Sequence, residues 1–380
     1  MRKNVGKNRV ATTRRDSGVE LLRIVAMLLI VFCHFVYWSH RNFVESPPLD
    51  LNKLLLQSFA QGKVGVICFF SISAWFLSSE STAGELKKNC RRVWILEREV
   101  LFWSWVLFFT TLFIYKPPTD WHSYLMLLFP LSSSVWWYIT SYAIFLLVSP
   151  FLTKGLKALS RSQHAALCII IVLLWGVMTL IPGIDMNLGG ALTVSIMLVL
   201  YPIITYVKWY VGTPKLKTGL ILLATGFALI MLSYAVLPRL SGTLGLPINY
   251  YADGFWRLPV ISAGFGLTII FLNIHFYSRS INFIASSTVA VYLISAYPPL
   301  GSRIFGLVPE PFSVWHAGVF VLLVFIICIG ADCIRRGLFA LTVDRNRGKL
   351  FDRLSSFCTS LNFFKQLSSL DHMNSIEQQQ

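Results

Sequence analysis

Arg23 and His34 are the two residues whose types and spacing most clearly point to chemistry, and both lie in the first hydrophobic stretch of the chain. Eleven helical residues turn through roughly three full turns plus 20° and rise roughly 16 Å, so both side chains are expected on one stripe of a helix at two depths. An arginine and a histidine are costly inside a membrane, where such residues usually line a polar path or a site. The pair therefore predicts a path along this helix.

The two residue types suit the transfer of an acyl group. Near neutral pH a histidine can remove the proton of a hydroxyl that attacks an acyl carbon. A guanidinium makes bidentate contacts to phosphates, and the pantetheine arm of an acyl-CoA is about as long as the separation of the pair. The alternative is that Arg23 reaches the inner headgroups and pairs with Glu20, while His34 is a hydrogen-bonded polar residue between helices.

The elements that must position this pair are membrane helices. The 380 residues are 55% hydrophobic, 14% aromatic and only 13% charged, which is typical of a polytopic membrane protein and excludes an ordinary soluble domain. We predict an all-α, polytopic membrane helix bundle with about ten transmembrane helices and a possible half-span around 121–131. The predicted spans lie near 18–38, 62–79, 93–115, 135–152, 165–182, 188–207, 217–237, 257–276, 283–300 and 313–335.

The basic residues alternate along the chain and set the expected topology. The net charge is +16, and Lys and Arg crowd the first residues, the loop at Lys87–Arg92 and the tail. This positive-inside pattern predicts that both termini are cytoplasmic and that the charge contacts anionic lipid, not nucleic acid. We predict three parts, namely a basic cytoplasmic arm at 1–17, a membrane domain at 18–336 and a partly interfacial, partly disordered cytoplasmic tail at 337–380. The seven cysteines show no metal-site spacing, so no metal is expected.

Further arginines lead into the third predicted span. Arg91 and Arg92 belong to the basic loop, and Arg98 lies deeper, flanked by Glu97 and Glu99. The first two follow the positive-inside rule, whereas Arg98 either forms an internal ion pair or helps to bind the nucleotide of a donor.

Several motifs carry a resemblance to the membrane acyltransferase-3 family, whose signature is an arginine, ten residues and a histidine. Glu20 to His34 resembles the family's opening helix, and 65–77 resembles its second helix, which includes Ser73. The segments 87–92, 136–152, 281–287 and 291–294, the last with Tyr292, resemble the family's later motifs. The resemblance runs in order from 18 to 335 and departs at Ala74, where the family often has glycine, and at Ser295, where it commonly has histidine.

The resemblance implies an integral membrane O-acyltransferase. It would move an acyl group, most often acetyl, from cytoplasmic acyl-CoA to a hydroxyl of a cell-surface polysaccharide or of its lipid-linked precursor. His34 would be the general base, Arg23, Arg91, Arg92 and Arg98 would bind the donor, and Glu20, Ser73, Tyr292 and Ser295 would support them. Acyl-CoA would be a co-substrate, with no bound cofactor, and the bacterial plasma membrane would be the location.

The acceptor would enter from the outer mouth of the bundle, where aromatic faces stack on sugars and polar side chains bond hydroxyls. An interfacial aromatic belt and an Asp253–Arg257 ion pair are the structural alternatives. The candidate contacts are His40, Trp121, His122, Trp136, Trp137, Tyr138, Asp253 and Arg257.

Two other functions remain open at this point. One is a transporter or flippase for a lipid-linked sugar or small molecule, although no internal repeat accompanies that interpretation. The other is an inactive member of the family that acts in glycan assembly, which Ser295 keeps open.

Overall fold

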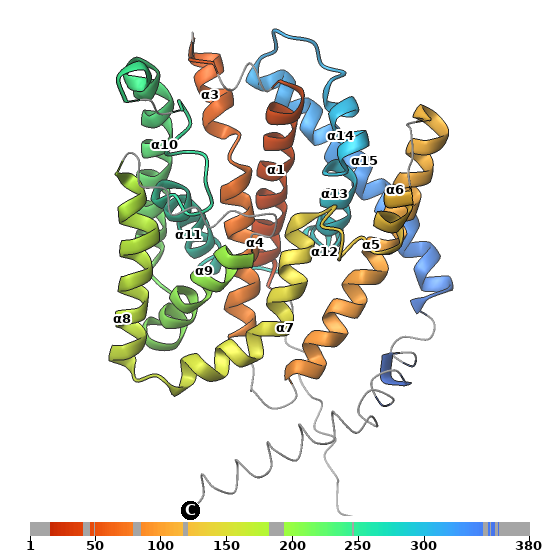
Figure 1. Cartoon of the computed structure of the whole chain (residues 1–380), viewed down its shortest axis with the longest axis horizontal. Helices are drawn as coiled ribbons and strands as arrows, with labels where there is room; N and C mark the ends of the chain where they lie inside the picture. The colour runs from red at the N-terminus through yellow and green to blue at the C-terminus, as the bar shows by residue number, and fades with distance from the viewer. Residues whose placement is uncertain are drawn as a thin grey trace, which may run out of the picture.

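The computed structural model describes residues 16–40, 46–48, 50–78, 85–116, 121–181, 194–244, 247–344, 349, 351–353 and 356. Within this part of the chain all regular elements are helices, which confirms the predicted all-α fold (Figure 1). Most of the predicted N-terminal arm, most of the predicted tail with its interfacial segment, and residues 188–193 of the sixth predicted span lie outside the described residues.

The helices follow one another with short connections. In chain order the α-helices are α1 (Ser17–Ser39), α3 (Leu51–Phe59), α4 (Gly62–Leu77), α5 (Glu85–Tyr115), α6 (Trp121–Leu128), α7 (Trp137–Ala158), α8 (Arg161–Ile171), α9 (Val194–Tyr206), α10 (Leu216–Leu244), α11 (Leu258–Leu272), α12 (Arg279–Ala285), α13 (Thr288–Ser295), α14 (Pro298–Phe305) and α15 (Val314–Leu341). A π-helical turn and a 3₁₀ turn extend α8 to Leu180, and a π-helical turn extends α9 to Val211.

Eight described helical segments are long and apolar enough to cross a membrane. The ninth predicted span is instead a bent pair, in which the helical stretch Arg279–Ser295 turns by 91° into α14. The eighth predicted span corresponds to α11, which has only 15 residues. A polytopic bundle is therefore confirmed, with fewer straight spans than the ten predicted.

The bend in the ninth span has a local cause. Pro298 and Pro299 open α14, and a proline restricts the residue before it to an extended backbone. Tyr297 has that conformation, with φ −74° and ψ 111°, so the helix cannot continue through it.

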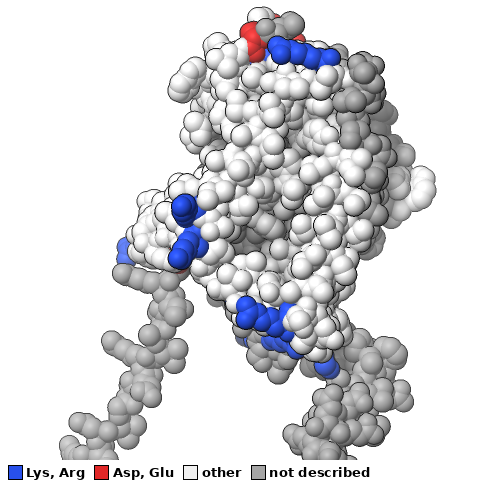
Figure 2. Space-filling view, turned by 90° about the vertical axis from the view of Figure 1, so that its left-hand side faces the viewer, with Lys and Arg blue, Asp and Glu red and all other residues white. Residues whose placement is uncertain are grey.

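The stretch between the first two predicted spans contains a helix that the sequence analysis did not predict, α3. Asp50 caps this helix by accepting a hydrogen bond from the backbone N–H of Lys53 at 2.7 Å. Together α3 and α4 make one membrane-length segment, Leu51–Leu77. The face in Figure 2 shows a broad uncharged belt between the few charged residues at its top and the Lys and Arg side chains lower down, as a membrane-embedded bundle requires.

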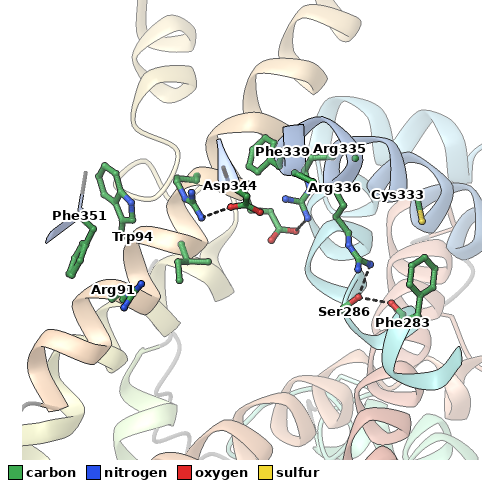
Figure 3. A pocket seen from close by; sticks show the side chains of 15 residues that line it. Arg91, Trp94, Phe283, Ser286, Cys333, Arg335, Arg336, Phe339, Asp344 and Phe351 are labelled. Atoms are coloured by element: carbon green, nitrogen blue, oxygen red, sulfur yellow. Dashed lines mark hydrogen bonds and ion pairs between the residues drawn. The ribbon is translucent and has the colours of Figure 1, made fainter. Parts of the chain in front are cut away.

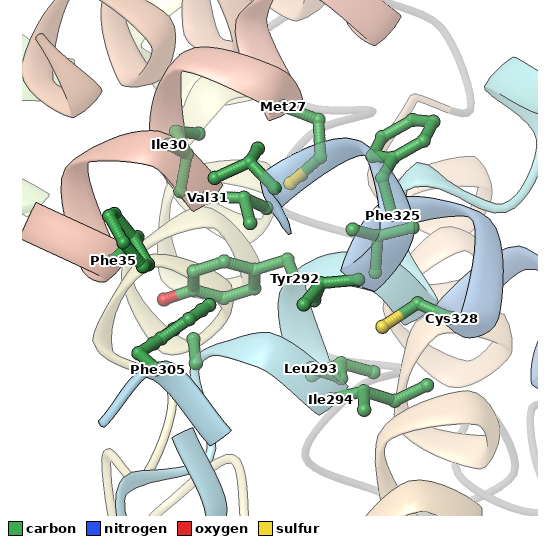
Figure 4. Packing of buried hydrophobic residues seen from close by; sticks show 14 of the residues in the cluster. Met27, Ile30, Val31, Phe35, Tyr292, Leu293, Ile294, Phe305, Phe325 and Cys328 are labelled. Atoms are coloured by element: carbon green, nitrogen blue, oxygen red, sulfur yellow. The ribbon is translucent and has the colours of Figure 1, made fainter. Parts of the chain in front are cut away.

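Helix α1 occupies the middle of the bundle (Figure 1) and packs against α4 and α11–α15. Gly65 lets α4 approach α1 closely, since a Cβ at this position would overlap the Ala26 carbonyl oxygen. On another side of α1, the ring of Tyr292 packs among Val31, Phe35 and Phe305 in a buried cluster (Figure 4). These contacts fix the depth and rotation of the helix that carries Arg23 and His34.

Candidate active site

The N-terminal end of α1 is held by polar contacts outside the span. Asp16 accepts a hydrogen bond from the backbone N–H of Gly18 at 3.0 Å and lies 2.6 Å from Nδ1 of His275. Partial burial acts to raise the pKa of Asp16, but the hydrogen bonds from His275 and Gly18 outweigh it and hold the pKa below its ordinary value. The helix then runs without interruption to Ser39. Arg23 and His34 therefore lie on one stripe of α1, separated by the axial rise of roughly 16 Å that the sequence predicts.

Arg23 contacts Glu20, its predicted local partner, and keeps N–H donors for a second partner. Its Nη1 atom donates to both carboxylate oxygens of Glu20 at 3.3 Å, and Glu20 is buried. Nε and Nη2 of Arg23 make no hydrogen bond to any described residue, and the side chain is 29% exposed. The carboxylate therefore positions the guanidinium while leaving donors for a second anion, such as a phosphate.

His34 is held by aromatic rings. Its ring stacks on Trp38 with centroids 4.6 Å apart and planes 15° apart, and the ring of Tyr292 lies 6.4 Å away. The Nδ1 atom is buried and has no hydrogen-bond partner among the described residues. A buried polar atom without a partner is costly, so a ligand or a water molecule that bonds this atom would offset that cost.

A row of aromatic side chains connects the two residues. Tyr138 on α7 lies edge-on to Tyr292 at 6.2 Å and stacks on Tyr142 at 6.1 Å. Arg23 is close enough to Tyr138 to interact with it electrostatically, while Tyr292 reaches His34. The order Arg23, Tyr138, Tyr292 and His34 therefore follows the stripe on α1, with rings supplied by two other helices.

The outer aromatic candidates separate in the structure. Trp136 is 1% exposed and its indole N–H donates to the carbonyl oxygen of Leu293 at 2.9 Å, so it serves packing. Trp137 packs against Phe255 with centroids 5.2 Å apart, next to Tyr138.

Three other outer candidates lie apart from this group. Trp121 and His122 lie on the exposed surface of α6. His40 is buried, and its Nδ1 atom lies 2.8 Å from a carboxylate oxygen of Glu310.

The suspected Asp253–Arg257 ion pair is replaced by other contacts. Asp253 forms a salt bridge with Lys63 of α4. Arg257 donates to the carbonyl oxygen of Thr179 at 2.7 Å and covers the ring of Tyr250 at 3.8 Å. Asp253 thereby joins the loop before α11 to α4 near Phe255, whose ring lies 5.9 Å from the Lys63 ammonium.

The arginines of α5 also separate. Arg92 donates to Asn89 at 2.6 Å, and Asn89 in turn donates to the Leu146 carbonyl on α7. Arg98 pairs at 3.4 Å with Asp344, which follows α15, so it forms an internal ion pair, one of the two roles expected for it. Arg91 and Arg98 line a cavity beside α15. The structure therefore does not gather these three arginines around Arg23.

The supporting residues differ in their surroundings. Ser73 donates to the Phe69 carbonyl within its own helix at 3.1 Å, a common local bond. The hydroxyl of Ser295 is buried without a hydrogen-bond partner among the described residues. Trp38 and Tyr142 are parts of the site that the sequence reasoning missed. The spacing of four residues from His34 could have indicated Trp38.

The fold and this site define a polytopic helical membrane protein whose candidate chemistry lies inside the bundle. The family model of the acyltransferase-3 acyltransferase domain matches residues 16–333, and the chain belongs to this family. It is therefore a multi-pass membrane acyltransferase. No match was found among curated proteins or among solved structures.

Proposed function

We propose that this acyltransferase moves an acyl group, in this proposal acetyl, from cytoplasmic acyl-CoA to a hydroxyl of a cell-surface polysaccharide or of its lipid-linked precursor, in a bacterial plasma membrane. The observation that carries the proposal is the unpartnered, buried Nδ1 of His34 at one end of an aromatic row that begins at Arg23. A base with an available lone pair and a cation with available N–H donors stand at two depths of one helix.

The donor would use the Arg23 end of this row. A phosphate can accept hydrogen bonds from the Nε and Nη2 atoms that Glu20 leaves unused. The acyl-pantetheine arm would then extend along Tyr138 and Tyr292 toward His34. Arg92, which faces α7 through Asn89, is the α5 arginine best placed to assist.

The acceptor would reach His34 from the opposite end of α1. Trp137 and Phe255 offer aromatic faces for a sugar ring, and Asp253 offers oxygens for its hydroxyls. His34 removes the proton of the acceptor hydroxyl as its oxygen attacks the thioester carbon. The new C–O bond forms, the C–S bond breaks, and the proton passes from His34 to the departing CoA thiolate. The ester and CoA thiol are the products.

One observation supports each of two alternative functions. A polytopic bundle with a polar stripe also suits a flippase, but family membership favours acyl transfer. An inactive family member would fit Ser295 at the position where the family commonly has histidine.

Substitution of His34 tests the proposal. We expect mass spectrometry of the surface polysaccharide to show an acyl mass increment in cells that make the wild-type chain, and His34→Ala to reduce it at least about 100-fold at equal protein level. His316→Ala, at the exposed start of α15, is the matched control and should keep the increment. Undiminished acylation by His34→Ala would remove His34 from the chemistry, and no increment with the wild type would favour the alternatives.

A further inference from the structure

A cavity of about 770 Å³ lies between α5, α12 and α15, away from the row that joins Arg23 to His34. Figure 3 shows Arg91 and Trp94 on one side of it and Arg335 and Arg336 on the other. Arg98 also lines the cavity, so four arginines contribute to one space.

Two of these arginines are matched by carboxylates. Arg335 bonds Asp332 at 2.6 Å and lies 3.3 Å from Glu99. Arg98 lies 3.4 Å from Asp344. These contacts join α5 to α15 and neutralise the centre of the cavity wall.

The other two arginines form no salt bridge with a described carboxylate, although Arg336 is close enough to Glu99 to interact with it electrostatically. Arg336 donates to the hydroxyls of Ser286 and Ser287 at 2.7 and 3.5 Å, and its guanidinium covers the ring of Phe283. Arg91 is exposed and makes no hydrogen bond or ion pair there. In the described chain the four arginines of the cavity face three carboxylates, Glu99, Asp332 and Asp344, which leaves an excess of one positive charge and favours a phosphate-bearing ligand.

The rest of the lining is apolar and partly faces outward. Trp94, Ile95, Phe283 and Phe339 line the cavity, and Ile95 and Phe283 are 50% and 48% exposed. On the surface of a membrane-embedded bundle such side chains lie against lipid tails. A ligand that joins a phosphate to hydrocarbon chains matches both parts of the lining.

The cavity is also separate from the proposed donor path. Its lining in the described chain comes from α5, α12, α15 and the residues after α15, and none comes from α1, α7 or α13, which carry the aromatic row. A nucleotide bound here would not lie along the row that leads to His34.

We propose that this cavity binds the headgroup phosphate of an anionic phospholipid. Arg336 and Arg91 contact the phosphate from two helices, and the lipid chains lie against Trp94, Ile95 and Phe283. The lipid fills the space between α5 and α15, where it adds to the Arg335–Glu99 and Arg98–Asp344 bridges.

Native mass spectrometry of the full chain tests this site. The protein is placed in phosphatidylcholine nanodiscs into which phosphatidylglycerol is titrated, and the retained lipid is counted. We expect Arg336→Gln and Arg91→Gln each to weaken phosphatidylglycerol retention about tenfold, because each change removes direct charge-assisted hydrogen bonds to the phosphate. Arg279→Gln, the same change at an exposed position on α12 outside the cavity, should leave retention unchanged.

The same preparation distinguishes a lipid from the nucleotide of the donor. Added CoA should not displace the retained phosphatidylglycerol, and Arg336→Lys should keep more of it than Arg336→Gln. Equal retention by Arg336→Gln, Arg91→Gln and Arg279→Gln would overturn the proposal, and so would displacement of the lipid by CoA. If Arg336→Gln fails to fold, the exposed Arg91→Gln decides the question alone.

Discussion

Gly301 of α14 controls where Trp38 lies, and through it the position of the His34 ring. A Cβ added to Gly301 would lie 2.6 Å from the Ser295 carbonyl oxygen and 2.9 Å from Cε3 of Trp38, where ordinary contact begins at 3.4 Å. Trp38 would have to move by about 0.5 to 1 Å, and overpacking of this kind costs about 1–3 kcal/mol. Because His34 rests on Trp38 at 4.6 Å, the ring would move with it.

A displacement of about 1 Å at a reacting group can cost about 100-fold in rate. We therefore expect Gly301→Ala to lower acyl transfer by about 10- to 100-fold at equal protein level, with acyl-CoA binding at the Arg23 end unchanged. Transfer is measured as the acyl mass increment on the surface polysaccharide. Gly318→Ala is the matched control, because a Cβ there meets nothing within 4 Å.

A second substitution separates the position of Trp38 from general damage. Trp38→Phe removes ring atoms that the new methyl group would overlap, so it should partly restore transfer in the Gly301→Ala background. Equal transfer by Gly301→Ala and Gly318→Ala would refute the reasoning, since the position of Trp38 would then not matter for the base.

Two further predictions concern the donor end and the packing of α1. Arg23→Ala should weaken acyl-CoA binding to the purified protein at least about tenfold, and Arg23→Lys should recover little because the planar fork is lost; wild-type binding by Arg23→Lys would contradict the phosphate role. Gly65→Val should lower the free energy of unfolding by about 1–3 kcal/mol, because its side chain would push α4 away from Ala26. Thermal unfolding in detergent measures this effect. Gly155→Val is the control, because a Cβ there meets nothing within 4 Å. Equal unfolding midpoints for the two variants would show that close α1–α4 contact is unimportant.

Local sequence patterns were enough to predict the helices and the stripe of α1 that carries Arg23 and His34. Hydrophobic runs of about 20 residues predict membrane helices because the backbone must bond internally there, and the described chain is helical. The Glu20–Arg23 contact follows from a spacing of three on a helix. The prolines at 298 and 299 could also have predicted the bend that divides the ninth span.

What the tertiary structure alone decided is which distant residues share a space. Tyr138 and Tyr292 are 154 positions apart in the sequence, yet their rings touch beside His34. The basic residues at the start of α5 form one cluster in the sequence. In the structure, the rotation of that helix turns Arg92 toward α7 and Arg91 toward α15. Helical periodicity fixes which side chains share a face, whereas only the packing of one helix against another fixes what that face meets.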